Sequence, residues 1–264
     1  MPDAVLRLAT EAMGTRFEVA LVARGVAATS MHLRAAGELA LGEIDEWHRR
    51  LTRFSADSWV SHVNRTAAAE AALLDGDLWS LMQDAVSVWQ DSDGAFDVAR
   101  GRGRDLLVDA AARTLRFRRV GPVLDMGAIG KGHALDCAAR SLRLHGVTRA
   151  FLQGGSSSGL GLGYDPEGRP WRVRVGDDVL ELMDAAFSLS DDGSQPWAPG
   201  GRHITDPRPP ASGGATRPQP RRRVLVTGPS ARLADAWSTA LVVLGTVPPA
   251  FPRGYDARFL RSDS

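Results

Sequence analysis

The segment from Val123 to Asp136 constrains this chain most, because an apolar run there passes into a helix through three glycines and a lysine. Glycine lets the backbone come close to a ligand, and the first turn of a helix has N–H groups without internal partners. The lysine, Lys131, adds a full positive charge. The pattern therefore predicts an anion site, with phosphate or pyrophosphate as the natural ligand.

The same segment is not the phosphate-binding loop of nucleoside triphosphatases. That loop requires a glycine where Asp125 stands and a serine or threonine where Gly132 stands. Lys131 is also the only lysine of the chain, and every other long basic side chain is arginine. Its isolation favours a binding or catalytic role for Lys131.

Composition limits the possible partners. Among 264 residues, 32 basic side chains nearly balance 31 acidic ones, so no overall field attracts the chain to nucleic acid or to an anionic membrane. Cys137 is the single cysteine, which excludes an intramolecular disulfide and a multi-cysteine metal site. The start of the chain lacks signal-peptide features, and no apolar run is long enough to cross a bilayer. We expect a cytoplasmic protein without membrane insertion.

Hydrophobic periodicity and turn residues predict the elements around this segment. Strands are expected at 15–22, 114–125 (a pair), 150–152, 171–175 and 223–227. Helices are expected at 31–51, 75–91, 132–144 and from the N-cap Ser230 to about Gly245. Residues 52–64 read as a polar loop, and the Pro/Gly/Arg-rich stretch at about 208–222 as a mobile loop. No second domain boundary is evident.

The last predicted helix carries a candidate cation site. Asp235 and Thr239 are four residues apart and share one face of it. A carboxylate and a hydroxyl suit magnesium, which binds a few oxygens together with waters and substrate phosphates. The alternative is an acidic residue placed near a helix N-terminus, where the helix dipole favours negative charge.

Two loops offer weaker signals. His203 and Asp206 lie in the sequence His-Ile-Thr-Asp-Pro, where either side chain could accept a proton, although a turn stabilised by Asp206 explains the pattern equally well. The glycine- and serine-rich run from Gly154 to Gly159 could hold phosphate or simply bend the chain after a strand. It lacks the glycine spacing of dinucleotide-binding folds.

The motifs and their order resemble the ApbE family, the FAD:protein FMN transferases. The glycine-lysine segment is similar to the family's most specific signature, Asp-Leu-Gly-x-Ile-Ala-Lys-Gly followed by an aromatic residue, Ala, Val and Asp. The other matching stretches are 12–15, 53–58 with 63–65, 94–97, 153–155, 203–207 and 234–240. The resemblance runs nearly end to end.

The resemblance implies one α+β domain over residues 1–264, with mixed and antiparallel sheets flanked by helices. It implies that magnesium is held by Asp235, Thr239 and a backbone carbonyl at Gly130, and that Lys131 steadies the pyrophosphate of the substrate FAD. His203, with Asp206, would accept the proton of a threonine hydroxyl on an acceptor protein, and AMP would leave. The expected FAD contacts are Met13, Gly14, Ser55, Asp97, Gly127, Lys131, Gly154, Gly155 and Ser190. The acceptor would carry a Ser/Asp-Gly-Ala/Ser-Thr-like motif.

Other activities remain open from the sequence. Val98-Ala99 replaces a threonine of the family pattern, the stretch between Gly101 and Leu115 is shorter, and Asp191 stands where the family has glycine. These departures favour a non-catalytic flavin binder of the same fold, and water as acceptor would give a magnesium-dependent FAD pyrophosphatase. An unrelated phosphotransferase using Lys131 is a third reading. Thr216, in a Gly-Gly-Ala-Thr run, resembles the acceptor motif and suggests self-flavinylation, although a flexible loop explains it more simply.

Overall fold

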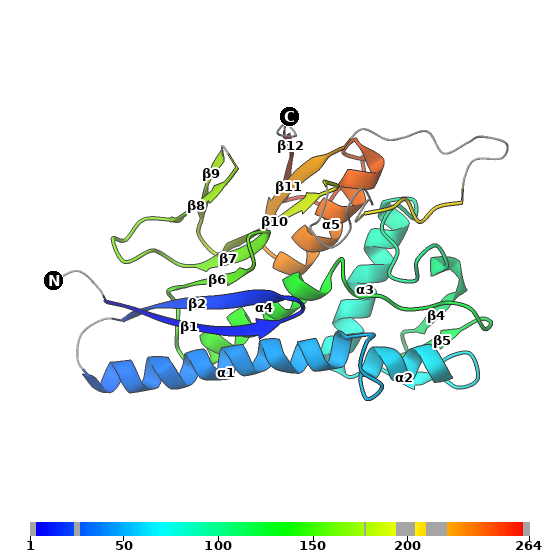
Figure 1. Ribbon diagram of the computed structural model, residues 1–264, viewed down its shortest axis with the longest axis horizontal. Helices are drawn as coiled ribbons and strands as arrows, with labels where there is room; N and C mark the ends of the chain where they lie inside the picture. Colours follow the sequence, from blue (N-terminus) through cyan, green and yellow to red (C-terminus); the bar gives the residue numbers. More distant parts are fainter. Residues whose placement is uncertain (1–3, 24–26, 177, 194–203, 210–220, 261–264) are drawn as a thin grey trace.

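A seven-stranded antiparallel sheet forms the centre of the protein in the computed structural model (Figure 1), which describes residues 4–23, 27–176, 178–193, 204–209 and 221–260. Each strand pairs with the next through backbone hydrogen bonds. In spatial order the strands are β1 (Ala4–Ala12), β2 (Thr15–Ala23), β6 (Ala150–Gly154), β7 (Ser158–Leu162), β10 (Ala185–Asp191), β11 (Arg223–Gly228) and β12 (Asp256–Leu260).

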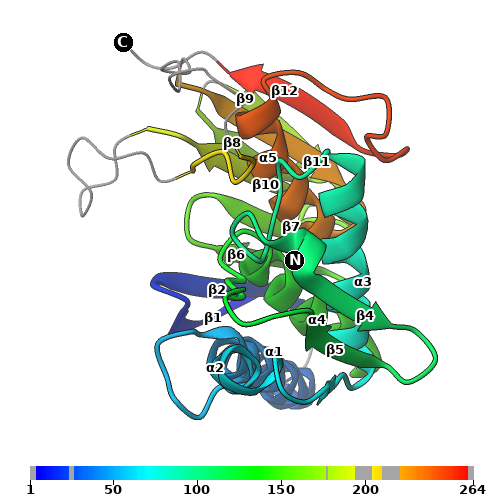
Figure 2. The same ribbon diagram turned by 90° about the vertical axis from the view of Figure 1, so that its right-hand side faces the viewer.

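Three helices pack against successive strands of this sheet. Helix α1 (Ala27–Leu51) contacts β1 and β2, α4 (Gly130–Leu144) contacts β6 and β7, and α5 (Ala231–Leu244) contacts β7, β10 and β11. Helix α3 (Gly76–Asp91) packs on α5, and the short α2 (Trp59–Thr66) follows α1, as Figure 2 shows from the side. The apolar residues between these layers form one continuous core. Because α4 and α5 are neighbours, their N-termini can share one site.

Two smaller sheets flank this body. Strands β3 (Ala72–Leu73), β5 (Thr114–Phe117) and β4 (Leu106–Asp109) form one, and the 3-10 helix η1 (Gly103–Asp105) leads directly into β4. The hairpin of β8 (Trp171–Val175) and β9 (Asp178–Leu182) is the other, and it closes a second apolar cluster around Phe187 and Leu225. The hairpin thus covers part of the sheet at β10 and β11.

The expected fold class is confirmed, since helices flank antiparallel sheets in an α+β arrangement. The expected helices appear as α1, α3, α4 and α5, and the strands at 15–22, 150–152, 171–175 and 223–227 as β2, β6, β8 and β11. Two expectations are wrong in part. Residues 52–64 contain most of α2. Strand β5 pairs with β3 and β4, which both precede it in the chain, whereas 118–125 forms no strand. Most of the 208–222 loop lies outside the described residues.

No helix in the described ranges combines the length and apolar character needed to span a bilayer.

A buried histidine lies where α4 packs on α1. His133 is 1% exposed, and its ring stands edge-on to that of Trp47 at a centroid distance of 4.1 Å. Nη1 of Arg232 lies 3.3 Å from His133 Nδ1, and Sγ of Cys137 lies 3.7 Å from Nε2. Burial, together with nearby guanidinium groups, lowers the pKa of His133 well below its ordinary value of 6.5. The imidazole is therefore neutral in the folded protein, with Nδ1 as the acceptor.

This histidine should make stability fall with acid. Below pH 6.5 the unfolded chain binds a proton at His133 that the folded chain does not, so the free energy of unfolding decreases as pH drops. The expected slope is about 1.4 kcal/mol per pH unit until the folded-state pKa is reached. Urea unfolding from pH 7 to pH 5 measures it. His133→Phe should flatten the slope and the exposed control His62→Gln should not; equal slopes in all three proteins would contradict the assignment.

Candidate functional site

The N-terminus of α4 is formed by a tight turn rather than by a side-chain cap. The N–H groups of Ile129 and Gly130 both donate to the carbonyl of Met126, at 3.2 and 2.8 Å. Within the described residues, the N–H groups of Ala128 and Lys131 have no hydrogen-bond partner. Two free N–H donors at the positive end of a 15-residue helix form an anion-binding site.

Helix α5 brings a buried carboxylate to the same place. Asp235 is 3% exposed, and its Oδ2 accepts a 3.1 Å hydrogen bond from the N–H of Gly132. The ammonium Nζ of Lys131 lies 3.5 Å from Asp235 Oδ1, and the Lys131 side chain is 24% exposed. The two residues predicted separately from sequence are therefore in contact, 104 positions apart. The ion pair holds the charged head of Lys131 at the mouth of the helix N-terminus.

A hydroxyl cluster from β10 and α5 surrounds this pair. Ser188 donates to Asp235 Oδ1 at 3.1 Å, while Ser190 lies 2.8 Å from Ser238 and 3.2 Å from Thr239. Ser190 and Thr239, both predicted, thus meet each other. Ser188 and Ser238 were missed by the sequence analysis. Ser188 and Ser190 alternate along β10, so their inward direction is a period-two signal that becomes visible only once the strand is known.

Two turns at the same edge of the sheet carry the predicted glycines. Met13 and Gly14 form the tip of the β1–β2 hairpin with φ of +52° and +73°, and Met13 Sδ lies 4.0 Å from where a side chain would begin at Gly130. The N–H of Gly155 donates to the carbonyl of Arg16 at 2.8 Å, and Gly154 pairs with Phe17. The hairpin tip and the β6–β7 turn therefore lie together beside the start of α4.

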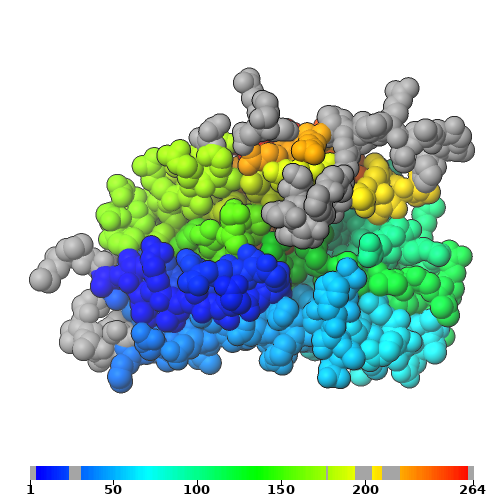
Figure 3. Space-filling model, in the orientation of Figure 1, coloured from blue at the N-terminus to red at the C-terminus, as the bar shows by residue number. Residues whose placement is uncertain are grey.

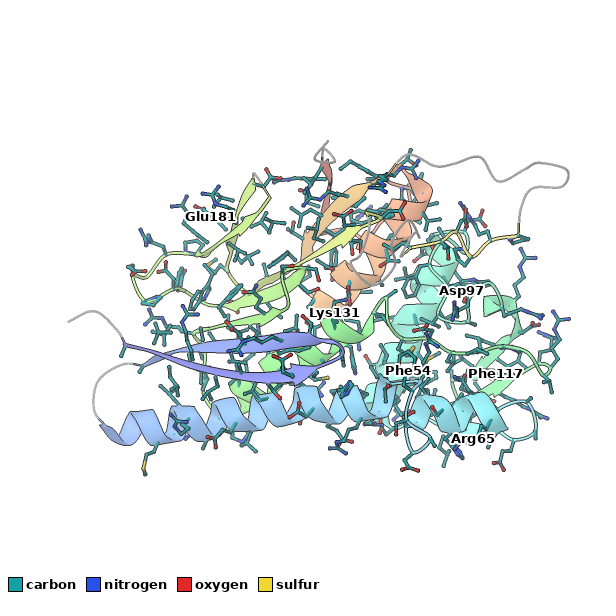
Figure 4. The ribbon with its side chains drawn as sticks, viewed as in Figure 1. Phe54, Arg65, Asp97, Phe117, Lys131 and Glu181 are labelled. Atoms are coloured by element: carbon teal, nitrogen blue, oxygen red, sulfur yellow. The ribbon has the colours of Figure 1, made fainter. Side chains whose placement is uncertain are left out.

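The figures show this arrangement. Figure 4 places Lys131 where α4 begins, next to the tip of the β1–β2 hairpin. In the space-filling view the surface is hollowed beyond that tip, with the blue hairpin on one side of the hollow (Figure 3). The site is thus accessible from one face of the protein.

Other predicted flavin contacts lie in nearby loops. Gly127 is exposed in the turn before α4, where its N–H donates to Asp125 Oδ1 at 3.1 Å. Ser55 is exposed in the loop before α2, and its carbonyl accepts from the N–H of Ser58. Arg53 of that loop pairs with Asp125 Oδ2 at 3.2 Å. The loop that carries Ser55 is thereby held beside the glycine-lysine turn, although Ser55 itself has no side-chain contact within the described residues.

Asp97 shapes a loop through its carboxylate. Oδ1 accepts the N–H of Ala99 at 2.7 Å, and Oδ2 accepts those of Gly101 and Gly103 at 3.0 and 2.9 Å. Burial raises the pKa of Asp97, and these hydrogen bonds oppose part of the rise. The residue after Asp97 contacts the glycine-lysine turn, because the N–H of Asp125 donates to the carbonyl of Val98 at 2.8 Å.

Removing the Asp97 carboxylate should loosen this loop. Asp97→Ala leaves three N–H groups without their acceptor, and we expect a loss of about 1–3 kcal/mol of local stability. Amide hydrogen exchange at Gly101 and Gly103 measures it, and both amides should exchange faster. Asp109→Ala is the control, because Asp109 holds only the exposed amides of Ala111 and Ala112. Unchanged protection at Gly101 and Gly103 would show that the loop does not depend on Asp97.

The predicted proton acceptors are placed only in part. His203 lies outside the described residues. Asp206 is exposed and bonded to Arg208, with its Oδ1 and Oδ2 receiving Nε and Nη2 at 2.9 and 2.7 Å. Burial works to raise the pKa of Asp206, but the hydrogen bonds from Arg208 outweigh it and hold the pKa below its ordinary value. In this conformation the Asp206 carboxylate is a weak base, because it is already paired with the Arg208 guanidinium.

The donor set around Asp235 fits a magnesium ion. It consists of oxygen atoms, with one carboxylate and several hydroxyls, and magnesium prefers few protein oxygens plus waters and phosphate. Among the described residues no group of three or more His, Cys, Asp or Glu side chains gathers to hold a metal. A backbone carbonyl could add a further oxygen. The carbonyl of Gly130 lies in the α4 ladder, whereas those of Gly127 and Ala128 accept no hydrogen bond within the described residues.

The chain is similar in sequence to FAD:protein FMN transferases. Over 134 residues it is 30% identical to the one from Escherichia coli (strain K12), a match that covers 46% of this chain and 37% of that protein. It is 23% identical to the one from Vibrio cholerae, over 92% of this chain and 83% of the relative. The chain thus spans less than two fifths of the first relatives that it matches.

Solved structures share the fold. A flavinyl transferase ApbE from Pseudomonas stutzeri, in its apo form, superimposes with a TM-score of 0.77 at 24% identity and covers 98% of this chain and 93% of its own. The flavin transferase ApbE from Vibrio cholerae gives a TM-score of 0.74 at 20% identity, over 92% and 88% of the two chains. The model of the ApbE family matches residues 13–249. This protein is a member of the ApbE family.

Proposed function

We propose that this protein transfers FMN from FAD to a threonine hydroxyl of an acceptor protein and releases AMP. The observation that carries the proposal is the contact between Lys131 and Asp235 at the N-terminus of α4, in a chain of the ApbE family. The names of its relatives supply the reaction class. We propose likewise that residues 1–264 form one transferase domain. We also propose that the protein acts in the cytoplasm, because a chain with a single cysteine has no intramolecular disulfide to maintain.

The pyrophosphate of FAD fits the start of α4. The N–H groups of Ala128 and Lys131 can donate to its oxygens, and the Lys131 ammonium supplies a full charge beside them. The ion pair with Asp235 holds the head group of Lys131 beside these donors. Charge that develops on the phosphate oxygens then meets donors that are already in position, which lowers the barrier without reorganisation.

Magnesium would be held by the Asp235 carboxylate, the Thr239 hydroxyl and a backbone carbonyl of the glycine-lysine turn. When bound, it neutralises charge on the pyrophosphate and on the departing AMP. Gly130 was the carbonyl expected from sequence, and the free carbonyls of Gly127 and Ala128 are further candidates. Ser188 keeps Asp235 oriented through its hydrogen bond to Oδ1.

The chemistry at phosphorus needs one base. The threonine oxygen attacks the phosphorus of the FMN half, the bond to the oxygen shared with AMP breaks, and the threonine proton leaves to a base. His203, with Asp206, is the proposed acceptor of that proton. Met13, Gly14, Gly127, Gly154, Gly155 and Ser190 are proposed to contact FAD around Lys131. Ser55 and Asp97 are proposed to contact the outer part of the flavin. The acceptor is proposed to carry a Ser/Asp-Gly-Ala/Ser-Thr-like motif.

Incubation with FAD and magnesium, with and without a threonine peptide of that motif, tests the proposal. AMP is followed by chromatography, and the control omits magnesium by chelation. AMP release that depends on magnesium and rises with peptide supports the transferase. AMP at the same rate with and without peptide makes the protein an FAD pyrophosphatase, and FAD binding without AMP makes it a flavin-binding protein.

A further inference from the structure

One stretch of the chain concentrates positive charge, and we call the exposed arginines of this stretch the arginine surface. Residues 100–120 hold seven arginines and two aspartates, a net charge of +5, in a chain whose overall net charge is +1. All seven arginines are exposed. They are Arg100, Arg102, Arg104, Arg113, Arg116, Arg118 and Arg119. The rest of the chain is therefore net negative, so the cluster is local and not a general bias of composition.

Few of these guanidinium groups are neutralised within the fold. Asp105 takes two of them, with Arg119 Nε at 2.9 Å and Arg102 Nη1 at 3.5 Å from its Oδ2. In the described ranges, four others have no ion-pair partner. These four are Arg104, Arg113, Arg116 and Arg118. Exposed cations without counter-ions give this part of the surface a positive potential, so a partner that supplies carboxylates is favoured here.

A groove of about 630 Å³ runs beside this surface, between α3 and β4. The four consecutive residues Leu106–Asp109 all line it, together with Trp89 and Arg104. Successive side chains of a strand point to opposite faces, so a groove lined by four in a row follows the edge of the strand. Among the described strands, β4 pairs only with β5, so this edge is free. A free strand edge next to a groove accepts an extended segment.

One wall of the groove is connected to the candidate site by hydrogen bonds and ion pairs. Asp97 and Val98 form part of its wall, and the carbonyl of Val98 holds the N–H of Asp125. Asp125 lies at the start of the turn that ends in Lys131, and it pairs with Arg53 and, at 3.9 Å, with Arg100 of the arginine surface. Figure 4 labels Lys131 at the site, Asp97 in the groove wall and Phe117 on β5.

We propose that the arginine surface and the β4 groove dock an extended, acidic segment of the acceptor protein, whose threonine then reaches the Lys131 site. Naming the partner as the acceptor rests on the proposed function. A polypeptide fits better than nucleic acid, because the groove offers apolar side chains of α3 and β4 and a single aromatic ring, Trp89, instead of a series of rings on which bases stack.

Binding of labelled peptides tests the docking without any chemistry. An acidic peptide with glutamates around the threonine motif is compared, by fluorescence anisotropy, with its glutamine analogue. The protein variant is the combined Arg104→Gln, Arg116→Gln and Arg118→Gln. The matched control is Arg34→Gln, Arg172→Gln and Arg258→Gln, which removes three exposed arginines elsewhere. We expect the first variant alone to weaken acidic-peptide binding about tenfold at low salt, since each exposed charge contact contributes little.

Three results would overturn the proposal: equal binding of acidic and neutral peptides, equal weakening by both triple variants, or tighter binding of a single-stranded oligonucleotide through the same arginines. An acidic peptide with alternate prolines should also bind more weakly, because proline cannot pair with a strand edge; equal binding would exclude pairing with β4. With the glutamine peptide at a saturating concentration, magnesium-dependent AMP release from FAD should be the same in all three proteins. Its absence would count against the proposed reaction and leave the binding result to judge the docking.

Discussion

Asp235→Asn is expected to lower magnesium-dependent AMP release from FAD by about 100-fold or more, the scale of losing one preorganised electrostatic contact at a reacting centre. Asparagine keeps the shape and one oxygen, so hydrogen bonds from Gly132 or Ser188 can persist. It removes the negative charge that holds Lys131 and that a magnesium ion requires. We expect kcat to fall and the magnesium concentration needed for half-maximal rate to rise.

The control for Asp235 is Asp256→Asn, which changes the same charge at an exposed pair with Arg258 on β12. Its activity should equal that of the unmodified protein. Urea unfolding of both variants separates a lost site from a lost fold. An Asp235→Asn protein that unfolds normally and retains full activity would remove Asp235 from the proposed site.

Gly132→Ala is expected to cause the largest loss of stability. A Cβ at this position would lie 2.2 Å from the carbonyl oxygen of Ala231 and 2.7 Å from the nitrogen of Arg232. Both are backbone atoms, so no side chain can rotate away, and the helix N-termini must separate. Overpacking usually costs about 1–3 kcal/mol, and we expect the upper end or more here. Because the Gly132 N–H also holds Asp235, activity should fall with stability.

The matched control is Gly42→Ala on the exposed face of α1. Nothing lies within 4 Å of its Cβ position, and alanine favours helix over glycine, so this change should stabilise the protein by up to about 1 kcal/mol. Urea unfolding gives both values. Equal stability of Gly132→Ala and the unmodified protein would contradict the close approach of α4 and α5.

Local signals predicted the elements that carry their own caps. Helix α5 begins after Ser230, whose hydroxyl accepts from the N–H of Leu233, and it ends at Gly245 with φ of +72°. Helix α2 was missed although Ser58 caps it in the same manner and Val60 and Val63 have helical spacing. The polarity of residues 52–64 outweighed that signal. Strand β4 was missed because both predicted strands were placed within 114–125. The true partner lies before that stretch, and only its pairing with β5 identifies it as a strand.

The site was predictable residue by residue but not as an assembly. Lys131 stood out as the only lysine and Asp235 by its spacing from Thr239, yet nothing in the sequence says that Asp235 reaches back to Gly132. That contact follows from the packing of α4 on α5. The role of Ser188 depends on the direction of alternate side chains along β10. The pairing of Asp206 with Arg208 depends on the conformation of their loop.

The position of the flavin on the acceptor tests the central claim most directly. After incubation with FAD and magnesium, the threonine peptide is fragmented in a mass spectrometer beside the same reaction run with Asp235→Asn. We expect FMN, less one water, on the threonine oxygen in the first reaction and an unmodified peptide in the second. An unmodified peptide in the first reaction, or FMN on the peptide in both, would contradict flavin transfer at the Lys131–Asp235 site.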